Sequence, residues 1–156
     1  MRSLVMYRSR YGNTERIARA VAEGLSERGE SRAVALTDLR PGDLETAHLV
    51  VLGAPTQMKR MPLSMRRFLR RSAHESWFGR PVAVFDTRLP GEQWRTGSAA
   101  GRLGARLQGM GAMLVAPPES FFVSGMRGPL EQGERERAKL WGRRLHLSDR
   151  VAVEGE

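Results

Sequence analysis

Short apolar runs alternate along the chain with longer segments in which apolar residues recur every three or four positions. The runs are continuously apolar, which predicts strands that are covered on both faces, as in a parallel sheet. They comprise residues 4–7, 33–36, 49–54 and 82–85, and a fifth run that spans 112–116 and continues into 121–123.

The longer segments predict helices between these strands. The first helix is expected over residues 14–28, where Ile17, Val21 and Leu25 share one face and Gly29 supplies a C-cap. Later helices are expected as a turn or two within residues 38–47, from Pro62 onward, over residues 97–108, and from Gly128-Pro129 onward.

This alternation predicts a single three-layer α/β domain over residues 1–148, with residues 149–156 as a flexible tail. The chain has 156 residues. A domain of this length buries roughly 68–70% of its unfolded surface, so its core needs no disulfide or metal to hold it together.

The composition excludes several kinds of site. The chain has no cysteine, which rules out disulfides, thiolate metal sites and thiol nucleophiles. His48, His74 and His146 have no histidine or carboxylate partner at ligand spacing, so we expect no metal site. No apolar run approaches the roughly 20 residues of a membrane span, and the first run is too short for a signal segment. We therefore expect no membrane span and a cytoplasmic location.

The chain is strongly basic, with 26 Lys and Arg residues against 17 Asp and Glu residues and a formal charge of +9. The arginines occur along the whole chain rather than on one element with interleaved aromatics, which makes nucleic-acid binding an unfavoured interpretation. One cluster comprises Lys59, Arg60, Arg66, Arg67, Arg70 and Arg71. Like charges four residues apart on a helix repel, so this cluster needs a partner or, as we favour, a solvated face.

The loop after the first predicted strand has the parts of a phosphate cradle. In an open α/β sheet, ligands bind beyond the carboxyl ends of the strands. Ser9, Asn13 and Thr14 offer polar side chains there, and Gly12 permits close approach of the backbone. The following helix presents unpaired N–H groups. An alternative interpretation is that Asn13 or Thr14 merely caps this helix.

Two further loops should reach the same edge of the sheet. Gly53–Met58 leaves the strand that would lie beside the first, and Asp86–Trp94 follows the next strand. The three loops together supply hydroxyls, backbone donors and an aromatic residue. This combination indicates a site for a flat ligand that bears a phosphate.

At these loops the sequence resembles the flavodoxin family. The family's phosphate loop, a hydroxyl residue followed by any residue, an aromatic or hydroxyl residue and Gly-Asn-Thr, is matched by Ser9-Arg10-Tyr11-Gly12-Asn13-Thr14. Its second signature, a buried strand that ends in Gly-x-Pro-Thr, is matched by residues 49–56. The short connection at Leu39–Leu44 is also similar, and the resemblance covers about residues 3–147.

The resemblance implies a flavodoxin-like fold, with a five-stranded parallel sheet of order 2-1-3-4-5 and helices on both faces. It also implies a non-covalent FMN site. The phosphate would be bound by Ser9, Tyr11, Gly12, Asn13 and Thr14, with Arg10 projecting nearby. One face of the flavin ring would be lined by Pro55, Thr56, Gln57 and Met58. The other face or the pyrimidine edge would be flanked by Asp86, Thr87, Arg88 and Trp94.

The ring site departs from the pattern of many members of the family. An aromatic residue often follows the Pro-Thr pair, whereas Gln57, Met58 and Lys59 stand there in this chain. The phosphate site is therefore better defined by the sequence than the ring site.

The resemblance implies a protein that carries electrons between a reductase and an acceptor, with no catalytic residue of its own. The first alternative is a small FMN-dependent oxidoreductase that acts on a quinone or a porphyrin-like substrate, and Pro117–Ser120 is the added segment that favours it. The second is a flavin-free basic interaction module on the same fold. Familiar carriers of this family are acidic, so the basic rim implies a redox partner with an acidic surface.

Overall fold

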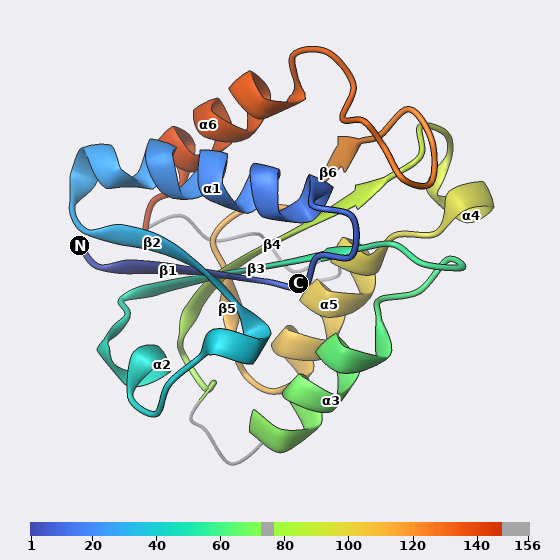
Figure 1. Cartoon of the computed structure of the whole chain (residues 1–156). Coiled ribbons are helices and arrows are strands. Elements are labelled where there is room, and N and C mark those ends of the chain that lie inside the picture. The colour runs from blue at the N-terminus through green and yellow to red at the C-terminus, as the bar shows by residue number, and fades with distance from the viewer. Residues whose placement is uncertain (73–76, 148–156) are drawn as a thin grey trace.

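The computed structural model describes residues 1–72 and 77–147, apart from the side chains of Gln93 and Trp94. Its strands are β1 (Ser3–Tyr7), β2 (Ser31–Ala35), β3 (Leu49–Pro55), β4 (Pro81–Arg88), β5 (Met113–Leu114) and β6 (Glu119–Phe122). They form one parallel sheet of order β2-β1-β3-β4-β5, in which β6 also pairs with β4 (Figure 1). The predicted strand order is confirmed. The predicted tail at residues 149–156 lies outside the described residues, as does His74.

The fifth predicted strand is divided into β5 and β6. β5 pairs with the start of β4, where Val82 lies opposite Leu114, and β6 pairs with its end, where Phe85 lies opposite Glu119. Residues 115–118 therefore lie opposite only residues 83–84. This longer segment cannot pair residue by residue with β4, so the ladder is interrupted there. Pro117 and Pro118 fall in this interval, and they have no N–H to donate to a ladder.

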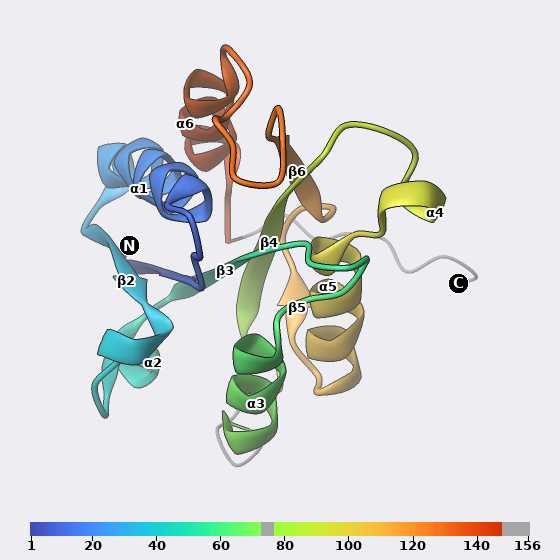
Figure 2. The ribbon, with the colours of Figure 1, turned by 45° about the vertical axis from the view of Figure 1, so that its right-hand side comes forward.

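Two pairs of helices cover the two faces of the sheet (Figures 1 and 2). α1 (Asn13–Leu25) and α6 (Glu134–Arg144) lie on one face, and α3 (Leu63–Arg71) and α5 (Ala99–Gly109) lie on the other. Short helices α2 (Asp43–Thr46) and α4 (Gln93–Thr96) and 3-10 turns at Ser26–Arg28 and Leu36–Asp38 complete the fold. Alternate strand residues supply the two cores, so Val50 faces α3 and α5 while Val51 faces α1 and α6.

Two predicted helix starts need correction. The helix expected over residues 97–108 begins at Ala99, because Gly97 has a φ of 74° and Ser98 caps the helix by accepting from the Gly101 N–H. The last helix was expected to begin at Gly128-Pro129 but begins at Glu134.

The segment before α6 folds back on itself instead of continuing as helix. Val123 forms an isolated antiparallel bridge with Leu130. The Ser124 N–H donates to the Pro129 carbonyl at 2.9 Å. Residues 123–133, named here the β6–α6 loop, thus form a compact loop at the carboxyl edge of the sheet.

α6 packs closely on α1, which fixes where this loop can lie. A Cβ at Gly24 of α1 would lie 2.2 Å from the Lys139 carbonyl oxygen, and a Cβ at Gly142 of α6 would lie 2.4 Å from the Val21 carbonyl oxygen. Only glycine at these two positions allows the backbones to come this close.

Candidate functional site

The three predicted loops meet at the carboxyl edge of the sheet. The hydroxyl of Thr14, in the first turn of α1, lies 2.8 Å from the hydroxyl of Thr87 on β4. The Thr56 N–H donates to the Thr87 carbonyl at 2.9 Å. Residues from the first, second and third loops are therefore in direct contact, as their positions after parallel strands predicted.

The loop after β1 is shaped by its own hydrogen bonds. Gly12 adopts a left-handed conformation with a φ of 90° directly before α1. The Ser9 hydroxyl accepts from the Gly12 N–H at 3.1 Å and from the Glu15 N–H at 3.3 Å. Ser9 thus supplies the hydroxyl that caps α1. Neither Asn13 nor Thr14, the alternative capping residues, has this role.

Several N–H groups of this loop remain available. The backbone N–H groups of Arg10, Tyr11, Asn13 and Thr14 donate to no acceptor in residues 1–72 and 77–147. They surround Gly12 at the positive end of the α1 dipole, where an anion is stabilised. The loop therefore fits a phosphate group.

Arg127 also reaches this loop. Tyr11 is 41% exposed, and the centroid of its ring lies 5.2 Å from Cζ of Arg10 and 5.8 Å from Cζ of Arg127. The Asn13 side chain donates to the Arg127 carbonyl at 3.2 Å. Nothing in the sequence around Arg127 signalled this role, because the contact joins residues more than a hundred positions apart.

The second loop turns sharply after Thr56. Gln57 and Arg60 exchange two backbone hydrogen bonds, of 2.7 and 2.8 Å, across a two-residue turn at Met58 and Lys59. These two residues have φ values of 47° and 66°, which side chains with a Cβ rarely adopt. Met58 is 93% exposed at the tip. Pro55 ends β3, three residues before this tip.

Asp86 joins the second loop to α5. Its carboxylate is fully buried, and Oδ2 accepts from the Thr56 hydroxyl at 3.0 Å, the Ser98 hydroxyl at 2.8 Å and the Ala100 N–H at 3.1 Å. The Thr56 hydroxyl in turn accepts from the Ala99 N–H at 2.8 Å. Asp86 therefore fixes the end of β3 against the first turn of α5.

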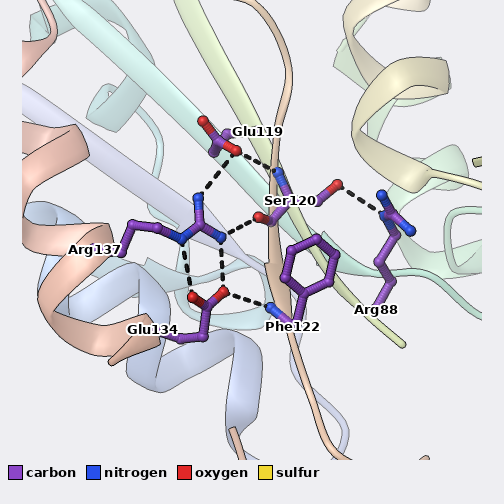
Figure 3. A network of polar contacts seen from close by, with 6 residues as sticks. All are labelled: Arg88, Glu119, Ser120, Phe122, Glu134 and Arg137. Carbon is purple, nitrogen blue, oxygen red and sulfur yellow. Dashed lines mark hydrogen bonds and ion pairs between the residues drawn. The ribbon is translucent and has the colours of Figure 1, made fainter. Parts of the chain in front are cut away.

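Arg88 is buried and braces the third loop. Its guanidinium donates to the Ser120 hydroxyl at 3.0 Å, to the Gly91 carbonyl at 2.9 Å and to the Thr96 hydroxyl at 2.8 Å. Figure 3 shows its bond to Ser120 beside β6. The backbone of Trp94 lies in α4, but its side chain lies outside the described part of the structure.

An open groove of about 790 Å³ lies beside the phosphate loop, between α1, the end of β2 and α3. Arg8, Arg67 and Arg71 line it, together with the partly buried ring of Phe68. The Arg8 side chain donates to the Ser64 hydroxyl at 3.1 Å, which joins the phosphate loop to α3. In the sequence, Arg67 and Arg71 are evident only as members of a charge cluster.

One acidic side chain borders the phosphate loop. The Tyr7 hydroxyl donates to Glu15 Oε1 at 2.8 Å. Burial and the neighbouring carboxylate raise the pKa of Tyr7, and the same hydrogen bond lowers the pKa of Glu15. At neutral pH, Tyr7 is therefore neutral and Glu15 is negatively charged. Glu15 lies in the first turn of α1. Among the described residues, no group of three or more His, Asp or Glu side chains is placed to hold a metal ion.

Comparison with known proteins agrees with this fold. Residues 5–141 match the family model described as flavodoxin. A flavodoxin from the domain Archaea superposes with a TM-score of 0.78 at 19% identity, covering 92% of this chain and 94% of that chain. Oxidised flavodoxin 1 from Bacillus cereus superposes with a TM-score of 0.75 at 22% identity, covering 91% of this chain and 95% of that chain. A WrbA-like flavodoxin from Agrobacterium tumefaciens superposes with a TM-score of 0.71 at 21% identity, covering 92% of this chain and 94% of that chain. A search of curated proteins found no match.

Proposed function

This chain belongs to the flavodoxin family, and on that premise we propose that it binds FMN without a covalent bond and transfers electrons between a reductase and an acceptor. The observation that carries the proposal is the loop after β1. It combines Gly12 at a φ of 90° with free N–H groups on both sides of that residue. The bound flavin would supply the redox chemistry, and the protein would supply binding and electrostatics.

The residues divide between the two ends of the cofactor. The loop from Ser9 to Thr14 would hold the phosphate through backbone N–H groups and the Thr14 hydroxyl. Thr56, Gln57 and Met58 would lie along one face of the ring, and the end of β4 at Thr87 would close the other side. Asp86 and Arg88 act from behind these segments, since their side chains bond to α5, the third loop and β6.

The partner we propose is a redox protein with an acidic surface. Lys59 and Arg60 are exposed on the turn after β3, and Arg10 and Arg127 are exposed at the phosphate loop. These four residues surround the edge through which electrons would pass, and their charge would guide an acidic partner to it. Within the described residues, no helix is both long and apolar enough to span a membrane.

The groove beside the phosphate loop favours a second candidate, an FMN-dependent oxidoreductase with its own small substrate. Its three arginines, which outnumber the lining carboxylates of Glu15 and Asp38, would together with the Phe68 ring suit a molecule with an anionic group and an apolar body. Steady-state oxidation of NAD(P)H with a quinone as acceptor separates the two candidates. A carrier should show almost no turnover without its partners, whereas an oxidoreductase should show saturable turnover.

Flavin binding itself is tested with the protein stripped of ligand and then titrated with FMN. We expect quenching of flavin fluorescence and a yellow protein after desalting. If excess FMN is neither quenched nor retained, both flavin functions are wrong. Salt-sensitive binding to a polyanion would then support the flavin-free interaction module.

A further inference from the structure

We propose that the β6–α6 loop forms one wall of the phosphate site and that Arg127 is an electrostatic ligand for the phosphate of FMN. This inference rests on the proposed function and assigns a residue that the sequence motif does not contain. It predicts that the C-terminal part of the chain distinguishes phosphorylated flavin from riboflavin.

The β6–α6 loop sits directly on the first residue of α1. The buried Asn13 side chain donates to the Arg127 carbonyl at 3.2 Å. Gly128 follows with a φ of 96°, and a Cβ there would lie 2.6 Å from Nδ2 of Asn13. Glycine is therefore required for the loop to approach this closely. Figures 1 and 2 both show this loop, in orange, beside the start of α1.

This contact brings a second guanidinium to the phosphate loop. Arg127 and Arg10 both lie near the Tyr11 ring, with Cζ atoms 5.8 and 5.2 Å from its centroid. A ring at this distance attracts a cation and orients it. Neither arginine pairs with a carboxylate in the described part of the chain. Two like charges beside one exposed ring repel each other, and an anion bound at the adjacent N–H groups would offset that repulsion.

The base of the loop is held by partly buried polar contacts (Figure 3). Glu134 accepts from the Phe122 N–H at 2.8 Å and pairs with Arg137 at 2.7 Å. Arg137 also pairs with Glu119 at 3.1 Å and donates to the Ser120 carbonyl. These bonds tie the end of β6 to the start of α6. Because the loop is fixed at both ends, little backbone freedom is lost when a ligand binds beside Arg127.

The charge of the ligand gives Arg127 its expected selectivity. A phosphate monoester carries about −1.5 to −2 charges at pH 7, and the loop N–H groups donate hydrogen bonds without neutralising it. A guanidinium adds charge-assisted hydrogen bonds to phosphate. Riboflavin lacks the phosphate, so Arg127 should contribute to the affinity for FMN and not to that for riboflavin.

The test compares two ligands in four proteins, with fluorescence quenching as the readout. We expect Arg127→Ala to raise the Kd for FMN about tenfold, in line with one lost charged hydrogen bond, and to leave the Kd for riboflavin within about twofold. Arg127→Lys should fall between wild type and Arg127→Ala. Arg106→Ala removes the same charge from an exposed position on α5 and should change neither affinity. The effect of Arg127→Ala should shrink at high salt.

A second variant tests the position of the loop. Gly128→Ala should push the loop away from Asn13 and reduce the affinity for FMN while that for riboflavin remains. Far-UV circular dichroism and thermal unfolding check that each variant is folded. An unchanged ratio of FMN to riboflavin affinity in folded Arg127→Ala overturns the inference while FMN binding, and with it the proposed function, stands. If wild-type protein binds neither flavin, the proposed function and this inference are both wrong.

Discussion

The loop after β1 and the turn after β3 meet at the same edge of the sheet, but they are built in opposite ways. The first places its left-handed conformation on Gly12 and uses the Ser9 hydroxyl to hold its backbone. The second places left-handed conformations on Met58 and Lys59, which are exposed. Such conformations cost roughly 1–2 kcal/mol in a residue with a Cβ. The loop proposed for the phosphate is thus held by its own hydrogen bonds, whereas the turn proposed for the ring holds strained and exposed residues.

The largest effect is expected from Asp86 on the ring side. Asp86→Ala leaves three donors without their acceptor, the partly buried Thr56 hydroxyl, the buried Ser98 hydroxyl and the buried Ala100 N–H. The free energy of unfolding should fall by about 3 kcal/mol, measured by denaturant titration. FMN and riboflavin affinities should fall together, because the damage lies on the ring side. Asp38→Ala, at an exposed position, is the matched control, and an equal effect in both variants would contradict this role of Asp86.

A smaller but more selective effect is expected from Gly12. Gly12→Ala places a Cβ at a φ of 90° and should lower the free energy of unfolding by about 1–2 kcal/mol. The affinity for FMN should fall while that for riboflavin stays nearly constant. Gly42→Ala is the control, since Gly42 has a φ of 92° before the short helix α2 and no atom within 4 Å of an added Cβ. Loss of FMN affinity in both variants would show a general effect of strain.

The phosphate side should also respond to acid through Glu134. Burial disfavours the Glu134 carboxylate, but its hydrogen bonds from Arg137 and the Phe122 N–H outweigh burial and lower its pKa. A lowered pKa in the folded state stabilises the protein above the unfolded pKa of about 4.3, and this contribution is lost as the pH falls through the folded pKa. Glu134→Gln should unfold about 1 kcal/mol more easily at pH 7. Its stability should decline less than that of wild type from pH 7 to pH 3. Denaturant titrations at each pH measure this difference. If the free energy of unfolding falls equally with pH in Glu134→Gln and in wild type, this role of Glu134 is wrong.

The smallest effect is expected from relief of strain at Lys59. Lys59→Gly and Lys59→Ala remove the same charge, but only glycine adopts a φ of 66° without steric cost. The relief of strain, roughly 1–2 kcal/mol, is partly offset by the larger conformational entropy that glycine loses on folding. The glycine variant should therefore be more stable than the alanine variant by about 0.5–1 kcal/mol, measured as a shift in the urea midpoint. Equal midpoints would mean that the turn is not strained, and the contrast with the phosphate loop would weaken.

Much of the fold could be predicted because the pattern of apolar runs is a local property of the chain. The four longer strands and the parallel sheet followed from continuous runs such as residues 49–54, and the confirmed strand order came from the family resemblance. The division of the last strand was missed, although Pro117 and Pro118 lie in the middle of that run. The late start of α6 was missed because Val123 and Leu130 pair with each other, a contact that competes with helix and has no local signal.

The sequence by itself determined the alternation of strands and helices, the motif from Ser9 to Thr14 on which the proposed phosphate site rests, and the basic character of the chain, because each depends on residue type and short spacing. Only the tertiary structure decided which distant groups share the site. It turned Asp86 toward α5 and Arg88 toward β6, and it brought Arg127 to Tyr11 and Asn13. The physical reason is that burial and hydrogen bonding between separate elements choose the direction of each side chain, and that choice is made only when the sheet and its helices have packed.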